Sequence, residues 1–376
     1  MRRAVLLGAA DSKRTQYLKR AAQQTGLSMT FLSWENWQET MGRLAQNPLL
    51  IKIDPPVWDS CILCELDSLS TDFKSQLNLL AQMADSHDIR FFNHPSAILS
   101  LLDKVQCKET LRQAGLPVTE ILARTPAGNL RTETALHGMA ASGMAEEPAP
   151  PLCHTSSRHM MVENAQQLLE IMRLHGIHQV FVKPVNGSGA AGVSAFRHQT
   201  HTGRMALYTC AVSHPSYGLV NTKRLRCFSH TDEILSFLDQ LLQTECVIER
   251  WHPKADYQGY SYDLRVVVQD GRVDYLLARL SKGPITNLHL NNRPLDIGLL
   301  GLASPVLESV AEISVKAARQ YPGLMSAGID ILLERGSLLP RIIEMNGQGD
   351  LIYQDIYHEN TIYRHQAELI KRMEAP

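Results

Sequence analysis

The chain has 376 residues, 44% of them hydrophobic and 20% charged, which is ordinary for a globular protein of two or three domains. A formal net charge of −1 excludes the basic excess of a dedicated nucleic-acid binder, and no apolar run approaches the roughly 18 residues of a membrane span. Seven scattered cysteines favour a reducing cytoplasm over a disulfide framework.

Residues 1–93 are predicted to form an α/β unit with a small, mostly parallel sheet. The short apolar run AVLLG soon meets Asp11 and Lys13, so we interpret it as a first strand rather than a signal peptide. Strands are expected at 4–8, 27–34, 49–53 and 89–92, and helices at 12–26 and 73–88. Cys61 and Cys64 are interpreted as buried thiols, because no second pair or H-x-H partner supports a redox or zinc site.

The rest of the chain, from residue 94 on, is predicted to hold further helices and strands, with a first boundary at the Asn93-His94-Pro95 turn. Short helices are expected within 96–116, followed by helices at 163–176, 231–244 and 306–321, and by strands at 179–185 and 246–251. Hairpins are expected at 262–280, with the turn at Asp270-Gly271, and at 327–346. Residues 124–160 form a long insertion whose composition is compatible with a lid, a partner-binding segment or disorder.

The stretch FVKPVNGSGAAGV (181–193) contains Gly187-x-Gly189-x-x-Gly192, the letters of a dinucleotide fingerprint. That fingerprint also needs a following helix and an acidic residue about 20 positions on. Here VSAFRH reads as a returning strand, and no Asp or Glu occurs between Glu170 and Asp232. The sequence therefore disfavours an NAD-dependent oxidoreductase.

A strand, a glycine-rich turn and a second strand instead predict a flexible phosphate-binding flap. Glycines let backbone N–H groups approach phosphate oxygens, Ser188 adds a hydroxyl donor, and Lys183 enters the flap as a point charge. No G-x-x-x-x-G-K-[ST] loop is present. The alternative is an ordinary hairpin with a surface lysine.

A triphosphate needs a magnesium site, and the last hairpin offers oxygen ligands. Glu344 and Asn346 share a strand face by alternation, and an odd-numbered loop centred near Ser337 would set Asp330 opposite Glu344. The partners Ile329, Ile331, Ile343 and Met345 are then expected to face the core. The alternative is a solvent-exposed polar face.

Arginines lie between the flap and these carboxylates. Asp263 and Arg265 share a strand face, and Arg279 lies on the return strand. The two arginines can clamp a carboxylate or a developing acyl phosphate, or they can form structural salt bridges. Lys282, a third catalytic candidate, and Asn287 follow in a turn-rich segment.

In this order, DKVQCKETLRQAGLPV, FVKPVNGSGAAGV, VIERW, DLRVVV, NLHL, GIDILL and EMNGQGDL resemble the motifs of ATP-grasp enzymes over about residues 94–365. The branch that they resemble contains the ribosomal-protein glutamate ligase and glutathione synthetase, and a little-characterised bacterial ATP-grasp subfamily is more similar still. The resemblance implies a pre-ATP-grasp domain at 1–93, a central subdomain at 94–248 and a C-terminal subdomain with the metal site at 249–376.

The resemblance also implies an ATP-dependent carboxylate–amine ligase that works through an acyl phosphate, using ATP and two Mg²⁺ ions, for which Mn²⁺ can substitute. The resemblance implies phosphate contacts for Lys104 and Lys183, and a flap at Gly187–Gly192 that closes over the phosphates. It implies a hinge at Glu249, Arg250 and Trp251 whose backbone groups read adenine, a nucleotide contact for Asp263, and a place near the phosphates and metal for Asn287. It also implies acyl-phosphate contacts for Arg265 and Arg279, and metal ligation by Asp330, Glu344 and Asn346.

The chain departs from the ligase pattern where the acceptor should bind. Asn291-Asn292 stand where the glutamate ligase has a glycine pair, and GQGDL follows the metal asparagine in place of a small residue and proline. The expected substrate is therefore a small molecule, an amino acid or a peptide, and a homo-oligomer is compatible with the sequence. The second hypothesis is a nucleotide-binding regulatory or scaffold protein without turnover.

Overall fold

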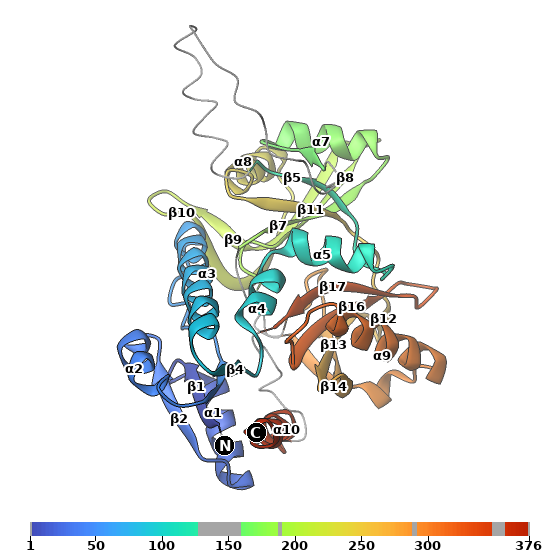
Figure 1. Ribbon diagram of the computed structural model, residues 1–376. Helices are drawn as coiled ribbons and strands as arrows, with labels where there is room; N and C mark the ends of the chain where they lie inside the picture. Colours follow the sequence, from blue (N-terminus) through green and yellow to red (C-terminus); the bar gives the residue numbers. More distant parts are fainter. Residues whose placement is uncertain (1, 127–158, 187–189, 288–291, 348–357, 375–376) are drawn as a thin grey trace, which may run out of the picture.

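The computed structural model describes residues 2–126, 159–186, 190–287, 292–347 and 358–374. Within these residues the chain forms three β-sheets with helices packed against them, so the predicted α/β class is confirmed (Figure 1). None of the helices in the described ranges is long and apolar enough to cross a membrane.

The N-terminal sheet is parallel, with the strand order β2-β1-β3-β4. Helix α1 ends at Gly26, whose φ of +67° is left-handed, as the glycine predicts. Cys61 and Cys64 lie where α3 begins and are exposed, so their interpretation as buried thiols is wrong. The elements of this unit are β1 (Arg3–Gly8), α1 (Lys13–Thr25), β2 (Met29–Ser33), α2 (Trp37–Leu44), β3 (Leu49–Ile53), α3 (Leu63–Ser86) and β4 (Ile89–Phe91).

The second sheet has seven strands in the order β10-β9-β8-β7-β11-β5-β6. Helices α7 and α8 cover one of its faces with an apolar cluster that includes Leu168 and Phe237. Most of the predicted insertion, 127–158, lies outside the described residues. The segment contains α4 (Pro95–Leu102), α5 (Lys104–Gln113), β5 (Ile121–Arg124), β6 (Met160–Met161), α7 (Ala165–Leu174), β7 (Gln179–Pro184), β8 (Ser194–Gln199), β9 (Arg204–His214), β10 (Gly218–Phe228), α8 (Thr231–Leu241) and β11 (Cys246–Arg250).

The third sheet has the order β15-β14-β13-β16-β17, with β12 beside β13, and α9, α4 and α5 pack on its core. The turn Asp270-Gly271 joins β13 to β14 with φ angles of +50° and +71°, so the predicted hairpin is confirmed. The elements are β12 (Asp256–Tyr257), β13 (Tyr260–Gln269), β14 (Arg272–Ser281), β15 (Arg293–Asp296), the 3₁₀ helix η2 (Ile297–Leu300), α9 (Ser304–Arg319), β16 (Ser326–Leu333), β17 (Pro340–Asn346) and α10 (Thr361–Met373).

The last helix, α10, returns to the N-terminal unit. Its residues Ile362 and Tyr363 share an apolar cluster with Leu6 and Leu18 of the first strand and helix. This packing brings the two ends of the chain close together (Figure 1).

Helix α3 reaches the entrance of the glycine-rich loop. Lys74 Nζ donates to Asn186 Oδ1 over 2.5 Å, and Asn186 Nδ2 donates to Asp67 Oδ1 over 2.7 Å. The N-terminal unit is therefore tied to the residue that precedes Gly187.

Candidate active site

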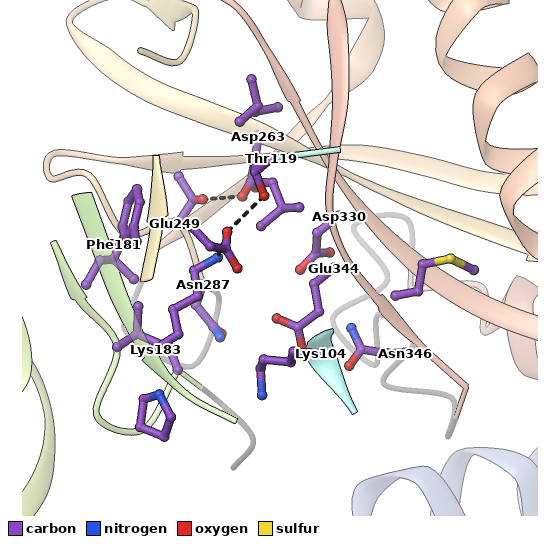
Figure 2. A pocket seen from close by; sticks show the side chains of 18 of the residues that line it. Lys104, Thr119, Phe181, Lys183, Glu249, Asp263, Asn287, Asp330, Glu344 and Asn346 are labelled. Atoms are coloured by element: carbon purple, nitrogen blue, oxygen red, sulfur yellow. Dashed lines mark hydrogen bonds and ion pairs between the residues drawn. The ribbon is translucent and has the colours of Figure 1, made fainter. Parts of the chain in front are cut away.

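A cavity lies between the second and third sheets, and side chains of β7, β11, β13, β14, β16 and β17 line it (Figure 2). Six cationic side chains and four carboxylates among the described residues line this cavity, which gives a formal charge of +2 with His252 neutral. They are Lys104, Lys183, Arg250, Lys254, Arg265 and Arg279, with Glu249, Asp263, Asp330 and Glu344. The excess of positive charge favours an anionic ligand.

Glu249 lies at the centre of a buried cluster beneath the cavity. Its Oε2 lies 2.7 Å from Lys108 Nζ and 2.8 Å from Lys183 Nζ, and it accepts from the Thr119 hydroxyl over 2.8 Å. Burial alone would raise the pKa of Glu249, but the two ammonium groups lower it to about 2. Glu249 is therefore ionised throughout the neutral range.

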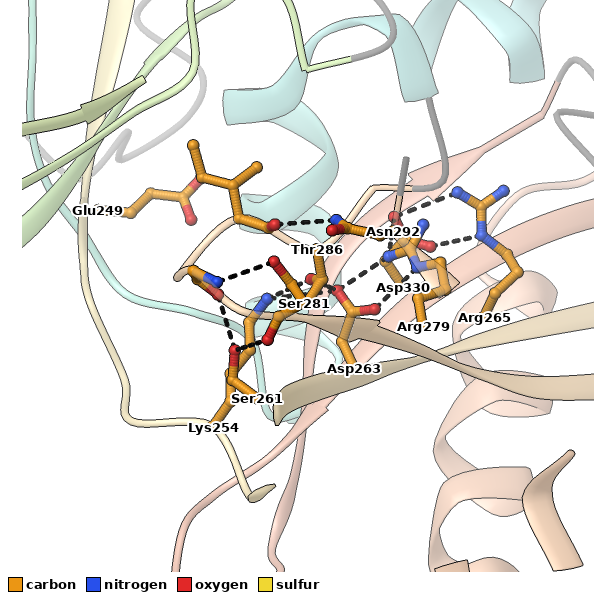
Figure 3. A network of polar contacts seen from close by, with 12 residues as sticks. Glu249, Lys254, Ser261, Asp263, Arg265, Arg279, Ser281, Thr286, Asn292 and Asp330 are labelled. Atoms are coloured by element: carbon orange, nitrogen blue, oxygen red, sulfur yellow. Dashed lines mark hydrogen bonds and ion pairs between the residues drawn. The ribbon is translucent and has the colours of Figure 1, made fainter. Parts of the chain in front are cut away.

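A second network runs across the third sheet (Figure 3). Asp263 faces Arg279 across the β13–β14 pair, and Arg279 donates from Nε over 2.7 Å and from Nη2 over 2.9 Å. Arg279 Nη2 also lies 3.0 Å from Asp330 Oδ2, whose carboxylate receives Arg265 Nε over 2.5 Å. Lys254 Nζ completes the network, 3.3 Å from Asp263 Oδ2.

Burial and neighbouring charges shift the pKa values of three groups in this network. Burial would raise the pKa of Asp263, but Arg279 and Lys254 hold it below the usual range. Burial likewise opposes the charge of Arg279, yet Asp263 and Asp330 raise its pKa. For Lys254 burial is the larger effect and lowers the pKa despite Asp263. Asp263 and Arg279 therefore remain charged, so removing either partner leaves the other as a buried unpaired charge.

We expect Arg279→Met to destabilise the fold by about 3–5 kcal/mol, because Asp263 and Asp330 would both lose a buried partner. Urea unfolding measures this loss. The control is Arg335→Met, whose partner Asp256 lies in an exposed ion pair and whose loss should cost about 0–1 kcal/mol. Equal losses for the two variants would contradict the assignment of a buried network.

Asp330 and Glu344 lie opposite each other, as predicted, but not through the predicted loop. A β-bulge at Ile343 shifts the register, so Ile331 pairs with Ile342 while Asp330 pairs with Glu344. The prediction that Ile343 faces the core is wrong: Ile342 takes that position, and Ile343 lines the cavity.

Glu344 and Asn346 point toward the cavity near Asp330 and Lys104 (Figure 2). Within the described part of the chain, no hydrogen bond or ion pair engages the carboxylate of Glu344 or the amide of Asn346. Burial lowers the pKa of Lys104, against the attraction of Glu344. Carboxylate and amide oxygens are the ligands that a hard divalent cation prefers.

A metal ion beside Glu344 and Asn346 would need ligands other than acidic side chains. Among the described residues, no group of three or more His, Cys, Asp or Glu side chains could hold a metal ion. Asp330 is also engaged by Arg265 and Arg279: Nη2 of both arginines reaches Oδ2, whereas Oδ1 accepts from Arg265 Nε and keeps a further lone pair. The side chains therefore fit Mg²⁺, which uses one or two carboxylates and takes its remaining oxygens from water and phosphate.

Most of the predicted site residues reach the cavity, but Gly192, Trp251 and Lys282 are not among the residues that line it. Lys282 follows the end of β14, and its exposed side chain points to Tyr260, with Nζ 5.8 Å from the ring centroid. The Trp251 ring packs against Phe181, and its backbone N–H and C=O both bond to Gln179. Lys282 and Trp251 are therefore left out of the proposed site, and Gly187, Ser188 and Gly189 lie outside the described residues.

The loop that carries the fingerprint letters leads into strand β8, which pairs antiparallel with β7. The two predicted strands are thus confirmed, and in the described residues after Gly192 a strand, not a Rossmann helix, follows. Gly192 has a φ of +69°, and a Cβ there would lie 2.7 Å from Leu63 Cδ2 and 2.8 Å from Pro184 Cγ. Its backbone conformation and close packing require glycine.

We expect Gly192→Ala to lower the free energy of unfolding by about 2–4 kcal/mol, from a left-handed alanine and from overpacking. The control is Gly203→Ala, because Gly203 has a φ of +67° but open space around the added methyl group. Chemical denaturation should show a loss of only about 1–2 kcal/mol for the control. Similar losses in both variants would mean that the packing contributes nothing.

Several polar residues at the cavity were not predicted from the sequence. Thr119 and Lys108 bind Glu249, and Lys254 and Thr286 bind Asp263. Only Lys108 had a local signal, since it follows Lys104 by four residues and so shares its helix face.

No protein-family model matches the sequence, and no curated protein matches it. Solved structures do match over nearly the whole chain, and the architecture that they share defines the chain as having the ATP-grasp fold. The resemblance found in the sequence is confirmed at this level.

The matched structures include ATP-grasp ligase PsnB complexed with a minimal precursor, Mg and ADP, at 14% identity, covering 99% of this chain and 98% of that one, with a TM-score of 0.55. Macrocyclase MdnC of Microcystis aeruginosa MRC, bound with precursor peptide MdnA, matches at 12% identity over 98% and 99% of the chains, with a TM-score of 0.56. D-alanine–D-alanine ligase of Bacillus anthracis matches at 12% identity over 100% and 97%, with a TM-score of 0.52.

Proposed function

We propose that the protein is an ATP-dependent carboxylate–amine ligase. The observation that carries the proposal is a net-positive cavity, in an ATP-grasp fold, that contains Lys104, Lys183, the arginine pair, and the side-chain oxygens of Glu344 and Asn346, which have no hydrogen-bond or ion-pair partner among the described residues. Lysines suit phosphates, and arginines suit planar carboxylate or phosphoryl groups. The oxygens of Glu344 and Asn346 suit a hard cation.

ATP is the proposed nucleotide. Apolar walls for its base are available where the cavity is lined by Phe181, Val193, Ile285 and Leu332. Lys104 and Lys183 neutralise the phosphates, and Asn287 lies beside them. When bound, Mg²⁺ screens the phosphate charge, and Asp330, Glu344 and Asn346 are the residues that would hold it.

The proposed reaction has two steps. A substrate carboxylate oxygen bonds to the γ-phosphorus as the bond to the β–γ bridging oxygen breaks, which gives an acyl phosphate and ADP. An amine nitrogen then bonds to the acyl carbon, phosphate leaves with its C–O bond electrons, and the nitrogen loses a proton. Arg265 and Arg279 stabilise the negative charge of the acyl phosphate. Asp330 holds the guanidinium of Arg265 in place, and Asp263 holds that of Arg279.

The carboxylate and the amine belong to a small molecule, an amino acid or a peptide. Support comes from the fold's other members, since PsnB and MdnC have been solved with precursor peptides and a third is a D-alanine–D-alanine ligase. We propose that the chain divides into three units after residues 93 and 248, with α10 of the last unit packed on the first. A cytoplasmic location and a homo-oligomeric state remain predictions.

The test is a screen of amino acids and short peptides for stimulated ADP release with Mg-ATP, followed by mass spectrometry of the product. The proposal predicts that ADP release needs both a carboxylate and an amine, and that the mass of the product equals the summed masses of the two substrates less one water. ATP binding without ADP release from any pair would favour the alternative of a regulatory protein without turnover.

A further inference from the structure

Lys108 lies behind the cavity, on the helix that also carries Lys104, and its ammonium group does not line the cavity. Its side chain is 7% exposed, and that of its partner Glu249 is 1% exposed. Glu249 Oε2 receives Lys108, Lys183 and Thr119 together, whereas Glu249 Oε1 is buried with no hydrogen bond among the described residues. Two lysines thus share one carboxylate oxygen.

This sharing determines how much charge Lys183 can offer to a ligand. With both lysines protonated, the two ammonium groups and the Glu249 carboxylate carry one net positive charge. Lys108 then neutralises part of the Glu249 charge, and Lys183 need not neutralise all of it. If Lys108 were absent or neutral, Glu249 would pair with Lys183 alone and cancel its charge. In a dry site such a change acts strongly on an anion nearby.

We propose that Lys108 is a positioning residue for nucleotide binding, which offsets Glu249 so that Lys183 keeps its charge and position for the phosphates. The inference rests on the proposed ATP site and adds a residue that never touches the nucleotide.

The pKa of Lys108 depends on burial and on a small set of groups that face its ammonium group. They are Glu249 on β11, Lys183 on β7, the Thr119 hydroxyl, and Cys107 beside it on α5. Burial lowers the pKa of Lys108 to about 8, against the attraction of Glu249, and burial raises the pKa of Cys107 to about 11. Lys108 therefore loses its proton between pH 7 and 9, while Cys107 remains a thiol.

The first test compares variants by calorimetry with Mg²⁺ and a non-hydrolysable ATP analogue at pH 7. Lys108→Met is expected to weaken binding by roughly tenfold or more, and Lys108→Arg, which keeps the charge, to stay within about threefold of the wild type. The matched control is Arg112→Met, which removes a charge from the same helix at an exposed position and should change binding less than about twofold.

The second test is the pH dependence of the same binding, which a merely structural residue would not affect. Because the proton is lost above pH 8, wild-type affinity is expected to fall from pH 7 to pH 9.5, and Lys108→Arg is expected to lose less. Lys104 and Lys254 line the cavity with lowered pKa values, but both proteins contain them, so the difference between the profiles belongs to Lys108.

The outcomes separate the inference from the proposed function. Failure of the wild-type protein to bind the analogue would overturn both. Wild-type binding with an unaffected Lys108→Met, or with identical pH profiles for wild type and Lys108→Arg, would overturn the role of Lys108 alone. If Lys108→Met does not fold, the two pH profiles decide the question.

Discussion

Replacing Glu344 with glutamine is expected to lower kcat/KM for ATP by about 10³-fold or more while leaving the fold intact. The carboxylate faces the cavity, and no side chain in the described part of the chain depends on it for an ion pair or hydrogen bond. Glutamine keeps the size and removes the charge that a divalent cation needs. Steady-state kinetics across a Mg²⁺ titration, with thermal unfolding in parallel, measures both effects.

The carboxylate opposite provides the contrast. Asp330→Asn should lower activity and stability together, because Arg265 and Arg279 would lose a charged partner. An unchanged Mg²⁺ response in Glu344→Gln would show that the ion is held elsewhere, even if overall activity fell.

Replacing Lys183 with methionine is expected to lower kcat/KM for ATP by about 10²–10³-fold. The lysine lines the cavity at the base of the glycine-rich loop, and its ammonium group is the one of the Glu249 pair that faces the ligand space. Glu249 would keep Lys108 and Thr119, so we expect the protein to remain folded, as circular dichroism and thermal unfolding would verify.

The matched control is Lys74→Met. Lys74 also contacts the loop, through Asn186, but does not line the cavity. We expect its loss to reduce kcat/KM less than about tenfold. If the two variants behaved alike, the effect would come from the position of the loop and not from a phosphate contact.

The sequence predicted the polar face of the last hairpin well, because strand alternation depends only on neighbouring residues. Asp330 does lie opposite Glu344. The predicted loop was wrong since a bulge inserts one residue, and nothing in RIIEMN marks Ile343 as the extra residue. Strands β9 and β10 and helices α2 and α10 were not predicted; α10 is fixed by its packing on α1, which lies more than 300 residues away in sequence.

The hinge at Glu249 shows where local reasoning ends. The resemblance implied that backbone groups at this position read adenine, which stays a prediction, and the structure adds that the Glu249 side chain holds two lysines. The contacts of Glu249 with Lys183 and Thr119 span 66 and 130 residues, so no window of sequence could contain them. Lys282 shows the opposite case: it lies close in sequence to the predicted site residues, but β14 ends at Ser281, and the side chain of Lys282 lies outside the cavity.

The most direct test of the account is calorimetric titration of the purified protein with ATP, with and without MgCl₂, and with NAD in a parallel titration. The account predicts saturable ATP binding that Mg²⁺ strengthens, loss of that strengthening in Glu344→Gln, and no heat of binding with NAD. Binding of NAD without binding of Mg-ATP would contradict it.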